Sequence, residues 1–352
     1  QYTIKRTYTF YANKYKFDLK DEVAGLAEYW IALGPDFGVY DTKDDAPHIG
    51  PVILKDTDRI ELTAKNLDEL KTYKEGVRWI AQEDKYFFAS LIPSGQTLEA
   101  RAWKVKDSAL LAFKAKSGVN NFMIYAGPKE YERLEELNVG LEHVIDFGFF
   151  SILARPIFWA LKFLYKYIGN YGLAIILITI ITRVPFVPII AKGQKSMKKM
   201  QELQPKMNEL REKYKKDPQK LQKEMMEMYK KYKVNPMGGC LPMLLQIPVF
   251  FALYKVLMIA VELKGAPFML WITDLSAKDP YYIFPIVMGA TMVIQQKMTP
   301  TSLDPKQNKI MMLMPVIFTF MFLNFASGLV LYWLVNNILS IAQQIYINKK
   351  SS

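Results

Sequence analysis

Five apolar runs fill most of the chain after residue 170, and short polar segments separate them. An α-helix rises about 1.5 Å per residue, so roughly 20 apolar residues are needed to cross the ~30 Å hydrocarbon core of a bilayer. The fourth run has only 14 residues, or about 21 Å of helix, and a span that short thins the bilayer or is shielded by its neighbours. The pattern excludes a single soluble globule. It predicts five membrane-spanning helices, at residues 171–190, 237–261, 281–298, 310–323 and 328–347.

Charge divides the chain into two unlike parts. Residues 1–145 carry 20 Lys and Arg against 23 Asp and Glu, whereas residues 146–352 carry 26 against 11. Fourteen of the basic residues lie in one block, residues 192–235, together with six acidic ones. Because this basic excess lies between apolar runs of membrane length, it argues against DNA as a partner.

Alternating apolar and polar positions characterise residues 1–145, which we expect to form one domain. Tyr2, Ile4, Tyr8 and Phe10 follow the period of a strand with one buried face. Turn residues separate further runs of this kind, so the predicted fold is an antiparallel β-sandwich. We find no catalytic constellation in it and expect a binding or scaffolding domain. The strands are predicted at residues 2–10, 15–19, 52–54, 60–63, 86–92, 98–105 and 122–126, and a short helix should follow residues 127–128.

Cysteine and histidine usage limits the chemistry that the chain can perform. The single cysteine, Cys240, excludes a disulfide framework and a cysteine-built metal site. Both histidines, His48 and His143, precede the apolar part, so an active site inside the membrane would have no histidine. We therefore expect no enzyme activity, no cofactor and no metal.

Residues 149–169 predict an amphipathic helix in the membrane interface. Arg155, Lys162 and Lys166 form one stripe with Trp159, and aromatic and aliphatic residues occupy the other faces. Such a helix suits the boundary between headgroups and acyl chains. The alternative is an ordinary amphipathic helix that packs on the β-domain.

Loop charges predict the orientation, since Lys and Arg accumulate in cytoplasmic loops. The block at residues 192–235 and the C-terminal Lys349 and Lys350 should be cytoplasmic, whereas the acidic loop at residues 262–280 should lie outside. This arrangement places the β-domain outside the cytoplasm. An exported domain needs an upstream signal, so we expect a first transmembrane helix, or alternatively a signal sequence, to precede Gln1.

Residues 192–235 predict a helical hairpin within the membrane core of residues 170–348. Apolar residues recur at heptad-like spacing, and Asp217 with Pro218 can start a second helix. The apolar stripe forms the seam of the hairpin, or its flexible methionines also receive apolar substrate segments. The basic outer faces suit anionic lipid headgroups or ribosomal RNA. The methionines of this stripe are Met197, Met200, Met207, Met225 and Met228.

Arg183 is a charge within the first apolar run, 12 residues after Tyr171. An arginine at mid-membrane costs about 2.5–3.5 kcal/mol on insertion scales, and no Asp or Glu lies in the five runs to offset it. Either the side chain snorkels to the interface, or it lies in a hydrated cavity that opens to the cytoplasm. Polar residues that could line such a cavity are Thr179, Gln246, Gln295, Gln296, Asn336 and Asn337.

Several short motifs resemble the YidC family of bacterial membrane protein insertases, which is related to the mitochondrial oxidase-assembly and chloroplast albino insertases. The resemblance covers residues 149–347, and residues 1–145 look like the C-terminal portion of that family's large periplasmic domain. The motifs are Asn-Pro-Met-Gly-Gly-Cys at 235–240, Gln-Ile-Pro at 246–248, Ala-Pro-Phe at 266–268, Trp-Ile-Thr-Asp-Leu-Ser at 271–276, Asp-Pro-Tyr-Tyr at 279–282, Gln-Lys-Met at 296–298 and Ser-Gly-Leu-Val-Leu-Tyr-Trp at 327–333.

The resemblance implies a five-helix core around a hydrophilic groove that opens to the cytoplasm and to lipid but is closed on the outer side. It implies insertion of nascent membrane proteins in the bacterial inner membrane, with the Sec translocon, the ribosome and lipids as partners. Trp333 is a departure, because another aromatic residue is common there, but aromatic character is kept. The groove or substrate-contact positions implied are Thr179, Arg183, Gln246, Phe250, Gln296, Tyr332 and Trp333.

Two other functions are open to a chain of this composition. A solute transporter or channel would predict internal repeats, which we do not see. An intramembrane protease is suggested faintly by residues 325–328, but no histidine lies in a span to activate Ser327.

Overall fold

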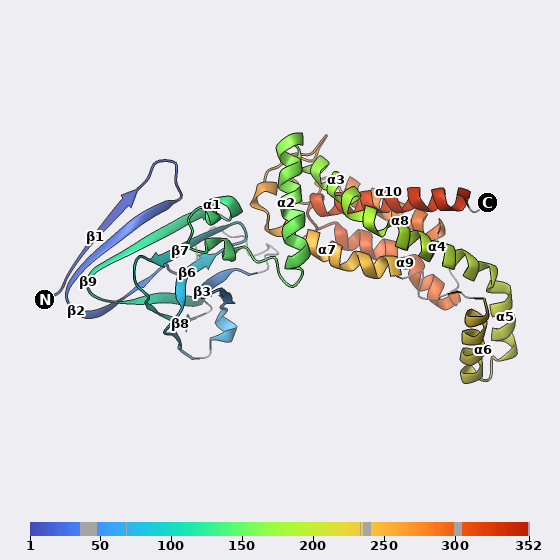
Figure 1. Cartoon of the computed structure of the whole chain (residues 1–352), viewed down its shortest axis with the longest axis horizontal. Coiled ribbons are helices and arrows are strands. Elements are labelled where there is room, and N and C mark those ends of the chain that lie inside the picture. Colours follow the sequence, from blue (N-terminus) through green and yellow to red (C-terminus); the bar gives the residue numbers. More distant parts are fainter. Residues whose placement is uncertain are drawn as a thin grey trace. The chain divides into compact units, whose positions relative to one another are not determined.

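The computed structural model describes residues 1–35, 48–67, 69–106, 108–232, 234, 241–298 and 305–350. Within them, the side chains at 194, 195, 197, 201, 241–245, 305–310, 348 and 350 fall outside the description. The motif at residues 235–240 and the predicted side-chain role of Met197 therefore lie outside the described residues. The chain forms two compact units (Figure 1): Gln1–Asp146 with Ile259–Glu262, and Phe147–Met258 with Leu263–Ser352.

The first unit is an antiparallel β-structure in which the strand order is β1-β2-β9-β7-β6-β3-β4, while β8 pairs with β9 and β5. Every strand pair in it is antiparallel. A short helix, α1 (Tyr131–Glu135), follows the last strand as predicted and buries Leu134. The strands are β1 (Thr3–Phe10), β2 (Lys16–Ala32), β3 (Gly50–Lys55), β4 (Asp58–Glu61), β5 (Lys71–Tyr73), β6 (Val77–Glu83), β7 (Phe87–Pro93), β8 (Glu99–Val105) and β9 (Ser108–Pro128).

Two strands are much longer than the sequence predicts. The predicted strands at 15–19 and 122–126 are only parts of β2 and β9, which pair along their lengths. The register shifts between Val23 and Glu28, and Gly25 and Gly118 there have φ of 79° and 112°. In the sequence these glycines interrupt the alternation of apolar and polar residues, so they look like turn residues. In the structure they lie at an irregularity in the hydrogen-bonded pairing of β2 with β9. The strands β5 and β6 were not predicted, because β5 has only three residues and the sequence of β6, VRWIAQE, does not keep a strict alternation of apolar and polar residues.

The core of this unit lies between strands that face one another across the sandwich. Ile53, Ile80 and Phe113 are fully buried in one cluster with Ala100 and Phe122. These residues come from β3, β6, β9 and β8, so residues far apart in the sequence close one hydrophobic core. At ~25 cal/mol per Å² of apolar surface removed from water, such a core supplies the main favourable term in the folding of this unit.

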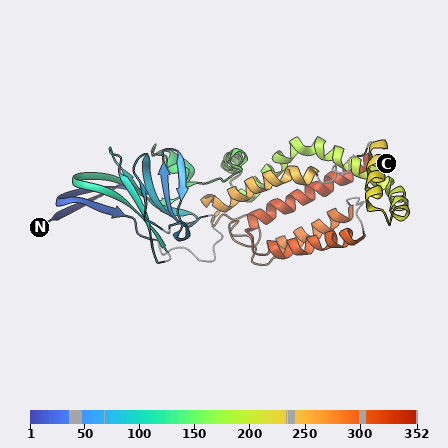
Figure 2. The same cartoon turned by 90° about the horizontal axis from the view of Figure 1, so that it is seen from below.

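The second unit is helical. Figure 2 shows its long helices running alongside one another, and α2 crosses them (Figures 1 and 2). The helix α10 packs against α3 and α8, α9 packs against α8, and α2 packs against α3. The helices are α2 (Ser151–Ile168), α3 (Tyr171–Arg183), α4 (Val187–Glu202), α5 (Gln204–Lys213), α6 (Pro218–Lys231), α7 (Leu241–Ile259), α8 (Ile283–Met298), α9 (Pro305–Phe322) and α10 (Ser327–Lys350).

Within the described residues, one helical stretch, Tyr171–Met200, is both long and apolar enough to cross a membrane, and Gln246–Ile259 and Met311–Phe322 are shorter apolar helices. The long stretch joins α3 to α4 through a 3-10 turn at Val184–Phe186, where Pro185 removes a helical backbone donor. The helix α9 has 18 residues, more than the 14 of the predicted fourth span, because it continues into a polar first turn. The count of five spans stays a prediction.

The helices α5 and α6 pack on each other (Figure 1). Asp217 caps α6 as predicted, since its side chain accepts a hydrogen bond from the backbone N–H of Lys220 at 3.0 Å. A cluster of buried side chains joins the end of α4 to α5 and α6, and it consists of Met200, Leu203, Met207, Met228 and Val234.

Candidate functional site

Arg183 is the last residue of α3, and its side chain lies against α10. Its Nη1 donates to the side-chain oxygen of Asn336 at 2.6 Å and to the backbone carbonyl of that residue at 3.1 Å. Its Nη2 donates to Oγ of Ser340 at 2.9 Å and to Oε1 of Gln343 at 3.3 Å. Arg183 is only 8% exposed. Among the described residues no carboxylate forms an ion pair with it, so all its partners are neutral.

The partners of Arg183 lie on one stripe of α10. Asn336, Ser340 and Gln343 follow one another at steps of 4 and 3, four residues after Tyr332, so all four lie on the same helix face. Gln343 also donates to the carbonyl of Val187 at 3.3 Å. The stripe therefore binds the end of α3 and the start of α4, where proline interrupts the helical hydrogen bonds.

A layer of aromatic side chains lies between this polar site and the start of α10. Trp333 packs against Phe250 of α7 with ring centroids 4.9 Å apart, and against Phe318 and Phe322 of α9 at 5.9 and 5.2 Å. Gln246 of α7 donates a hydrogen bond to the hydroxyl of Tyr332, which is 1% exposed. The structure thus brings together four of the predicted groove residues, Gln246, Phe250, Tyr332 and Trp333, at the contact of α7 with α10.

Two predicted groove residues do not join this network. Thr179 lies one turn before Arg183 and is buried, but its hydroxyl donates to the carbonyl of Ile175 at 2.6 Å within its own helix. A hydroxyl bonded in this way has its donor occupied and is less able to bind a substrate. Gln296 is half-buried near the C-terminal end of α8. Its part in a groove stays a prediction, as do those of the other residues.

Ser340 and Gln343 were missed by the sequence analysis. The sequence contains a pattern that could have identified them, because Ser340 and Gln343 continue the helical spacing of Tyr332 and Asn336 along one face of an otherwise apolar helix. Asn337, on the neighbouring face, donates to Oγ1 of Thr291 in α8 at 3.2 Å. The polar residues of α10 therefore serve two interfaces, and only one of them holds Arg183.

The methionines proposed for substrate recruitment lie mostly within the contact of α5 and α6. Met207 of α5 and Met228 of α6 are buried there together with Met200 from the end of α4, and Met225 packs against this cluster. The hydroxyl of Tyr229 lies 3.8 Å from Sδ of Met207, and burial raises its pKa. Met226 is 49% exposed and faces away from the cluster. The seam interpretation agrees with these positions.

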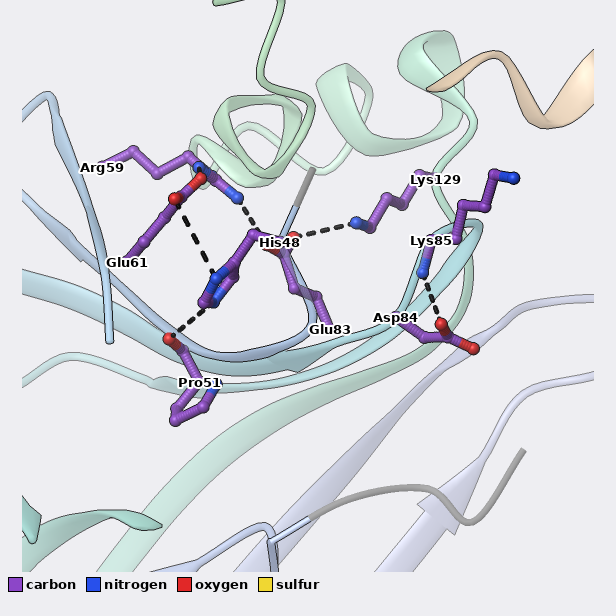
Figure 3. A network of polar contacts seen from close by, with 8 residues as sticks. All are labelled: His48, Pro51, Arg59, Glu61, Glu83, Asp84, Lys85 and Lys129. Carbon is purple, nitrogen blue, oxygen red and sulfur yellow. Dashed lines mark hydrogen bonds and ion pairs between the residues drawn. The ribbon is translucent and has the colours of Figure 1, made fainter. Parts of the chain in front are cut away.

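A second polar cluster lies in the β-unit. Figure 3 shows the carboxylate of Glu83 between Arg59 and Lys129, with His48 and Glu61 beside it. Burial alone would lower the pKa of Arg59, but Glu83 and Glu61 outweigh it and raise that pKa. Burial lowers the pKa of Lys129, and Glu83, 2.8 Å away, opposes the shift. The cluster ties β4, β6 and the segment after β9 together, and the described residues contain no His, Cys, Asp and Glu group able to hold a metal.

Comparison with known proteins decides the family. A family model described as 60Kd inner membrane protein matches residues 163–352, and one described as YidC periplasmic domain matches residues 1–160. The chain belongs to the YidC family of membrane protein insertases. The resemblance drawn from the sequence motifs is thereby confirmed, and the transporter or channel alternative has no support.

Similar YidC proteins match this chain along nearly its whole length. Membrane protein insertase YidC of Syntrophus aciditrophicus is 50% identical over 370 residues, which cover 99% of this chain and 67% of that protein. The protein of the same name from Geobacter sp. strain M21 is 48% identical over 366 residues, which cover 99% of this chain and 68% of the Geobacter protein. These relatives place the chain among inner-membrane proteins with a periplasmic domain.

A solved structure supports the fold. It is described as an active YidC insertase with the first transmembrane domain resolved, and it superposes with a TM-score of 0.50 at 20% identity, covering 96% of this chain and 93% of its own. The predicted order of an antiparallel β-sandwich followed by a helical region is confirmed.

Proposed function

We propose that this insertase receives hydrophilic parts of its substrates at Arg183, from the cytoplasmic side, and releases the apolar parts into lipid between its helices. The observation that carries the proposal is the neutral set of partners around Arg183. Since Asn336, Ser340 and Gln343 satisfy hydrogen bonds without cancelling charge, the site keeps a positive charge that attracts an acidic segment. The energy source is burial of the substrate's own apolar helix in lipid.

The topology proposed for this function follows the loop charges. Residues 1–145 form the periplasmic domain, residues 170–348 form a core of five transmembrane helices, and residues 192–235 form a cytoplasmic hairpin. On this topology α3 starts on the periplasmic side and brings Arg183 to the cytoplasmic half of the bilayer. Twelve residues separate Tyr171 from Arg183, or about 18 Å along the helix.

The helix α2 is proposed to lie in the periplasmic interface of the membrane. Its residues Ile157, Phe158 and Leu161 are buried, whereas Ile152 and Phe163 are 85% and 61% exposed. A helix with one face packed on protein and an exposed apolar surface flanked by basic residues suits the headgroup boundary. Lipid headgroups are therefore proposed as partners of α2.

The cytoplasmic hairpin is proposed to meet substrates before they reach the core. Because Met207 and Met228 are buried in the seam, these two side chains reach a substrate only when α5 and α6 separate. Its basic faces suit the ribosome and anionic lipids, and the Sec translocon is proposed as a further partner on family grounds. No covalent chemistry and no cofactor is needed for any of these steps.

Reconstitution tests this function. The purified protein in liposomes should insert a small membrane protein that has an acidic segment to be translocated, and protease protection would measure the inserted fraction. Empty liposomes and liposomes with the Arg183→Ala variant are the controls. Insertion by the variant equal to that by the wild type would contradict the role of Arg183. A flux of small solutes without insertion would favour a transporter.

A further inference from the structure

The segment between α7 and α8 carries two neighbouring apolar side chains at its surface. Met269 is 48% exposed and Leu270 is 82% exposed. No charged residue occurs from Ala266 to Thr273, whereas turns that face water are rich in polar residues and glycine. We call residues 268–272 the apolar loop. Its exposed surface is unfavourable in water, so its surroundings decide what covers it.

The apolar loop is a well-defined turn. The backbone N–H of Phe268 donates to the carbonyl of Ile272 at 3.0 Å, and the N–H of Ile272 donates to the carbonyl of Met269 at 3.1 Å. Outside this turn, the N–H of Leu275 donates to the carbonyl of Ala266 at 2.9 Å. Phe268 and Ile272 are buried. The two ends of the loop are therefore fixed in the protein, and the side chains at its tip are held outside the core.

Leu270 has a backbone conformation that is unfavourable for its residue type. Its φ is 54°, in the left-handed region that glycine and asparagine adopt more readily than leucine. The exposed side chain of Leu270 gains little packing within the chain to offset this strain. Strained backbone persists where the surroundings favour it, and it is common at sites of function. A turn that served only to connect α7 with α8 in water would favour glycine or asparagine here.

The apolar loop lies beside the first turns of two apolar helices. The ring of Phe268 is so close to Gly172 of α3 that a Cβ there would come within 2.0 Å of it. The ring of Trp271 lies 6.0 Å from that of Phe284 in α8, and Nε1 of Trp271 donates to Oδ1 of Asp279 at 3.0 Å. The loop is thereby attached where α3 and α8 begin.

The exposed apolar surface of the loop continues onto these helices. Leu173 in the first turn of α3 is exposed, as are Ile283 and Ile286 at the start of α8. Tyr281, whose ring centroid lies 6.4 Å from that of Trp271, is 65% exposed. Tryptophan and tyrosine concentrate where acyl chains meet water, because each has an apolar body and a polar group. This continuity with the apolar faces of membrane helices identifies lipid as the material that covers the loop.

We propose that Met269 and Leu270 enter the lipid at the boundary between headgroups and acyl chains and anchor the apolar loop there. Removal of the leucine side chain from water then outweighs the unfavourable φ of Leu270. The anchor fixes the depth at which α3 and α8 begin in the bilayer, a role separate from substrate binding at Arg183. On the proposed topology the leaflet is the periplasmic one, but the anchor itself does not depend on the orientation of the chain.

Depth-dependent fluorescence quenching tests the anchor. In a Cys240→Ser background, Leu270→Cys carries an environment-sensitive fluorophore, and the protein is reconstituted into vesicles of phosphatidylethanolamine and phosphatidylglycerol. Lipids with a nitroxide near the glycerol end of the acyl chain should quench the probe more than lipids with a nitroxide near the methyl end. Iodide on both sides of the membrane should quench it about tenfold more weakly than a probe in water, the factor expected from burial of a leucine side chain.

Two matched positions calibrate the depth. Val119 is 58% exposed in β9 of the β-unit, so a probe at Val119→Cys should be quenched by iodide and by neither lipid. Leu313 is also 58% exposed, and it lies nine residues before Phe322, the end of α9, or about 14 Å along the helix. A probe at Leu313→Cys should be quenched most by the deeper nitroxide. Both lipids occupy both leaflets, so the comparison tests the anchor separately from the proposed topology.

A second set of variants tests Leu270 itself. With the probe at Met269→Cys, Leu270→Asn should strengthen quenching by iodide and weaken quenching by lipid, because asparagine tolerates the positive φ but does not favour lipid. Leu270→Phe, which keeps an apolar side chain, should leave both unchanged. Equal quenching in the wild-type, Leu270→Asn and Leu270→Phe backgrounds would show that Leu270 is not the anchor.

Three outcomes with the probe at Leu270→Cys would overturn the proposal. Quenching by iodide as strong as at Val119→Cys would place the loop in water. Protection from iodide without quenching by either lipid would show that protein covers the loop instead of lipid. Quenching mainly by the deeper nitroxide, as at Leu313→Cys, would contradict a position at the headgroup boundary.

Discussion

The guanidinium of Arg183 and the side chain of Asn336 are joined by a hydrogen bond of 2.6 Å across 153 residues of sequence. The same nitrogen of Arg183 also reaches the carbonyl of Asn336, which accepts from Ser340 as well. This geometry differs from a snorkelling arginine, since the guanidinium is held against a neighbouring helix. It also differs from a free, hydrated cation, because several of its donors are occupied before any substrate arrives.

Arg183→Ala should impair insertion of substrates with acidic translocated segments most. A hydrogen bond to a charged group contributes ~1.5–3 kcal/mol, so we expect a rate about 10- to 100-fold lower. Arg183→Lys keeps the charge but loses the planar fork that reaches Asn336 and Ser340 together, and it should retain much of the activity. Insertion rates of one substrate and its acid-to-amide variant, with each protein, measure the effect. Equal fractional losses for both substrates would speak against the electrostatic role.

Gly289→Ala should destabilise the helical unit. A Cβ at Gly289 would lie 2.0 Å from Oγ1 of Thr319, and small residues at such contacts let helices approach closely. We expect a loss of about 1–3 kcal/mol from overpacking, seen as a lower melting temperature in detergent. In a Thr319→Ala background, which removes the clashing hydroxyl, the same substitution should cost clearly less. A cost that does not depend on residue 319 would show that the contact is not the cause.

The β-unit should lose stability as the pH rises above about 10. Burial raises the pKa of Tyr29, with a further contribution from Asp21, and burial also raises the pKa of Tyr73 and Tyr125. A phenol whose pKa is raised by folding favours the protonated folded state. Its stabilisation is present below the unfolded pKa of about 10 and is lost as the pH rises further. Denaturant unfolding of the full chain at pH 8 to 11 measures this slope, and Tyr29→Phe should flatten it.

Glu83→Ala should lower the free energy of unfolding of the β-unit more than Glu61→Gln does. Glu83 is 1% exposed and pairs with both Arg59 and Lys129, so its removal leaves two buried cations without that partner. Breaking a buried pair costs about 3–5 kcal/mol. Glu61 is 40% exposed at its side chain, and Glu61→Gln should cost about 0–1 kcal/mol after screening by solvent. Chemical denaturation of the two variants side by side measures both, and similar losses would contradict the bridging role of Glu83.

The helices α5 and α6 should exchange their amide hydrogens at least tenfold faster than α3 and α10. They have 10 and 14 residues, lengths at which an isolated helix is marginal in water, and they depend on one small methionine cluster. Met207→Ala removes a side chain that is 1% exposed and should speed exchange further, since such changes cost about 2–5 kcal/mol. Met226→Ala, at a 49% exposed position, is the matched control and should leave exchange unchanged. Exchange as slow as in α10 would contradict the prediction.

The sequence by itself determined which segments form strands and which form helices, because the periodicity of apolar residues depends only on the local sequence. Period two marked the β-unit, and heptad-like spacing with Asp217 marked the start of α6, where the cap forms through a hydrogen bond only three residues away. The motifs of the helical part determined the family. Arg183 stood out because a charge in an apolar run is visible without any knowledge of its neighbours.

The tertiary structure alone decided which residues Arg183 meets. Asn336, Ser340 and Gln343 face Arg183 only because α10 packs on α3 in one particular rotation. Neither the sequence of α3 nor that of α10 specifies that the two helices are neighbours. The lengths of β2 and β9 were likewise set by their mutual pairing, which carries both strands through glycines that look like turns. The start of α10 is likewise bonded by backbone carbonyls, because the N–H groups of Ser327 and Gly328 donate to Ala277 and Leu275, and main-chain partners of this kind leave no side-chain pattern in a sequence.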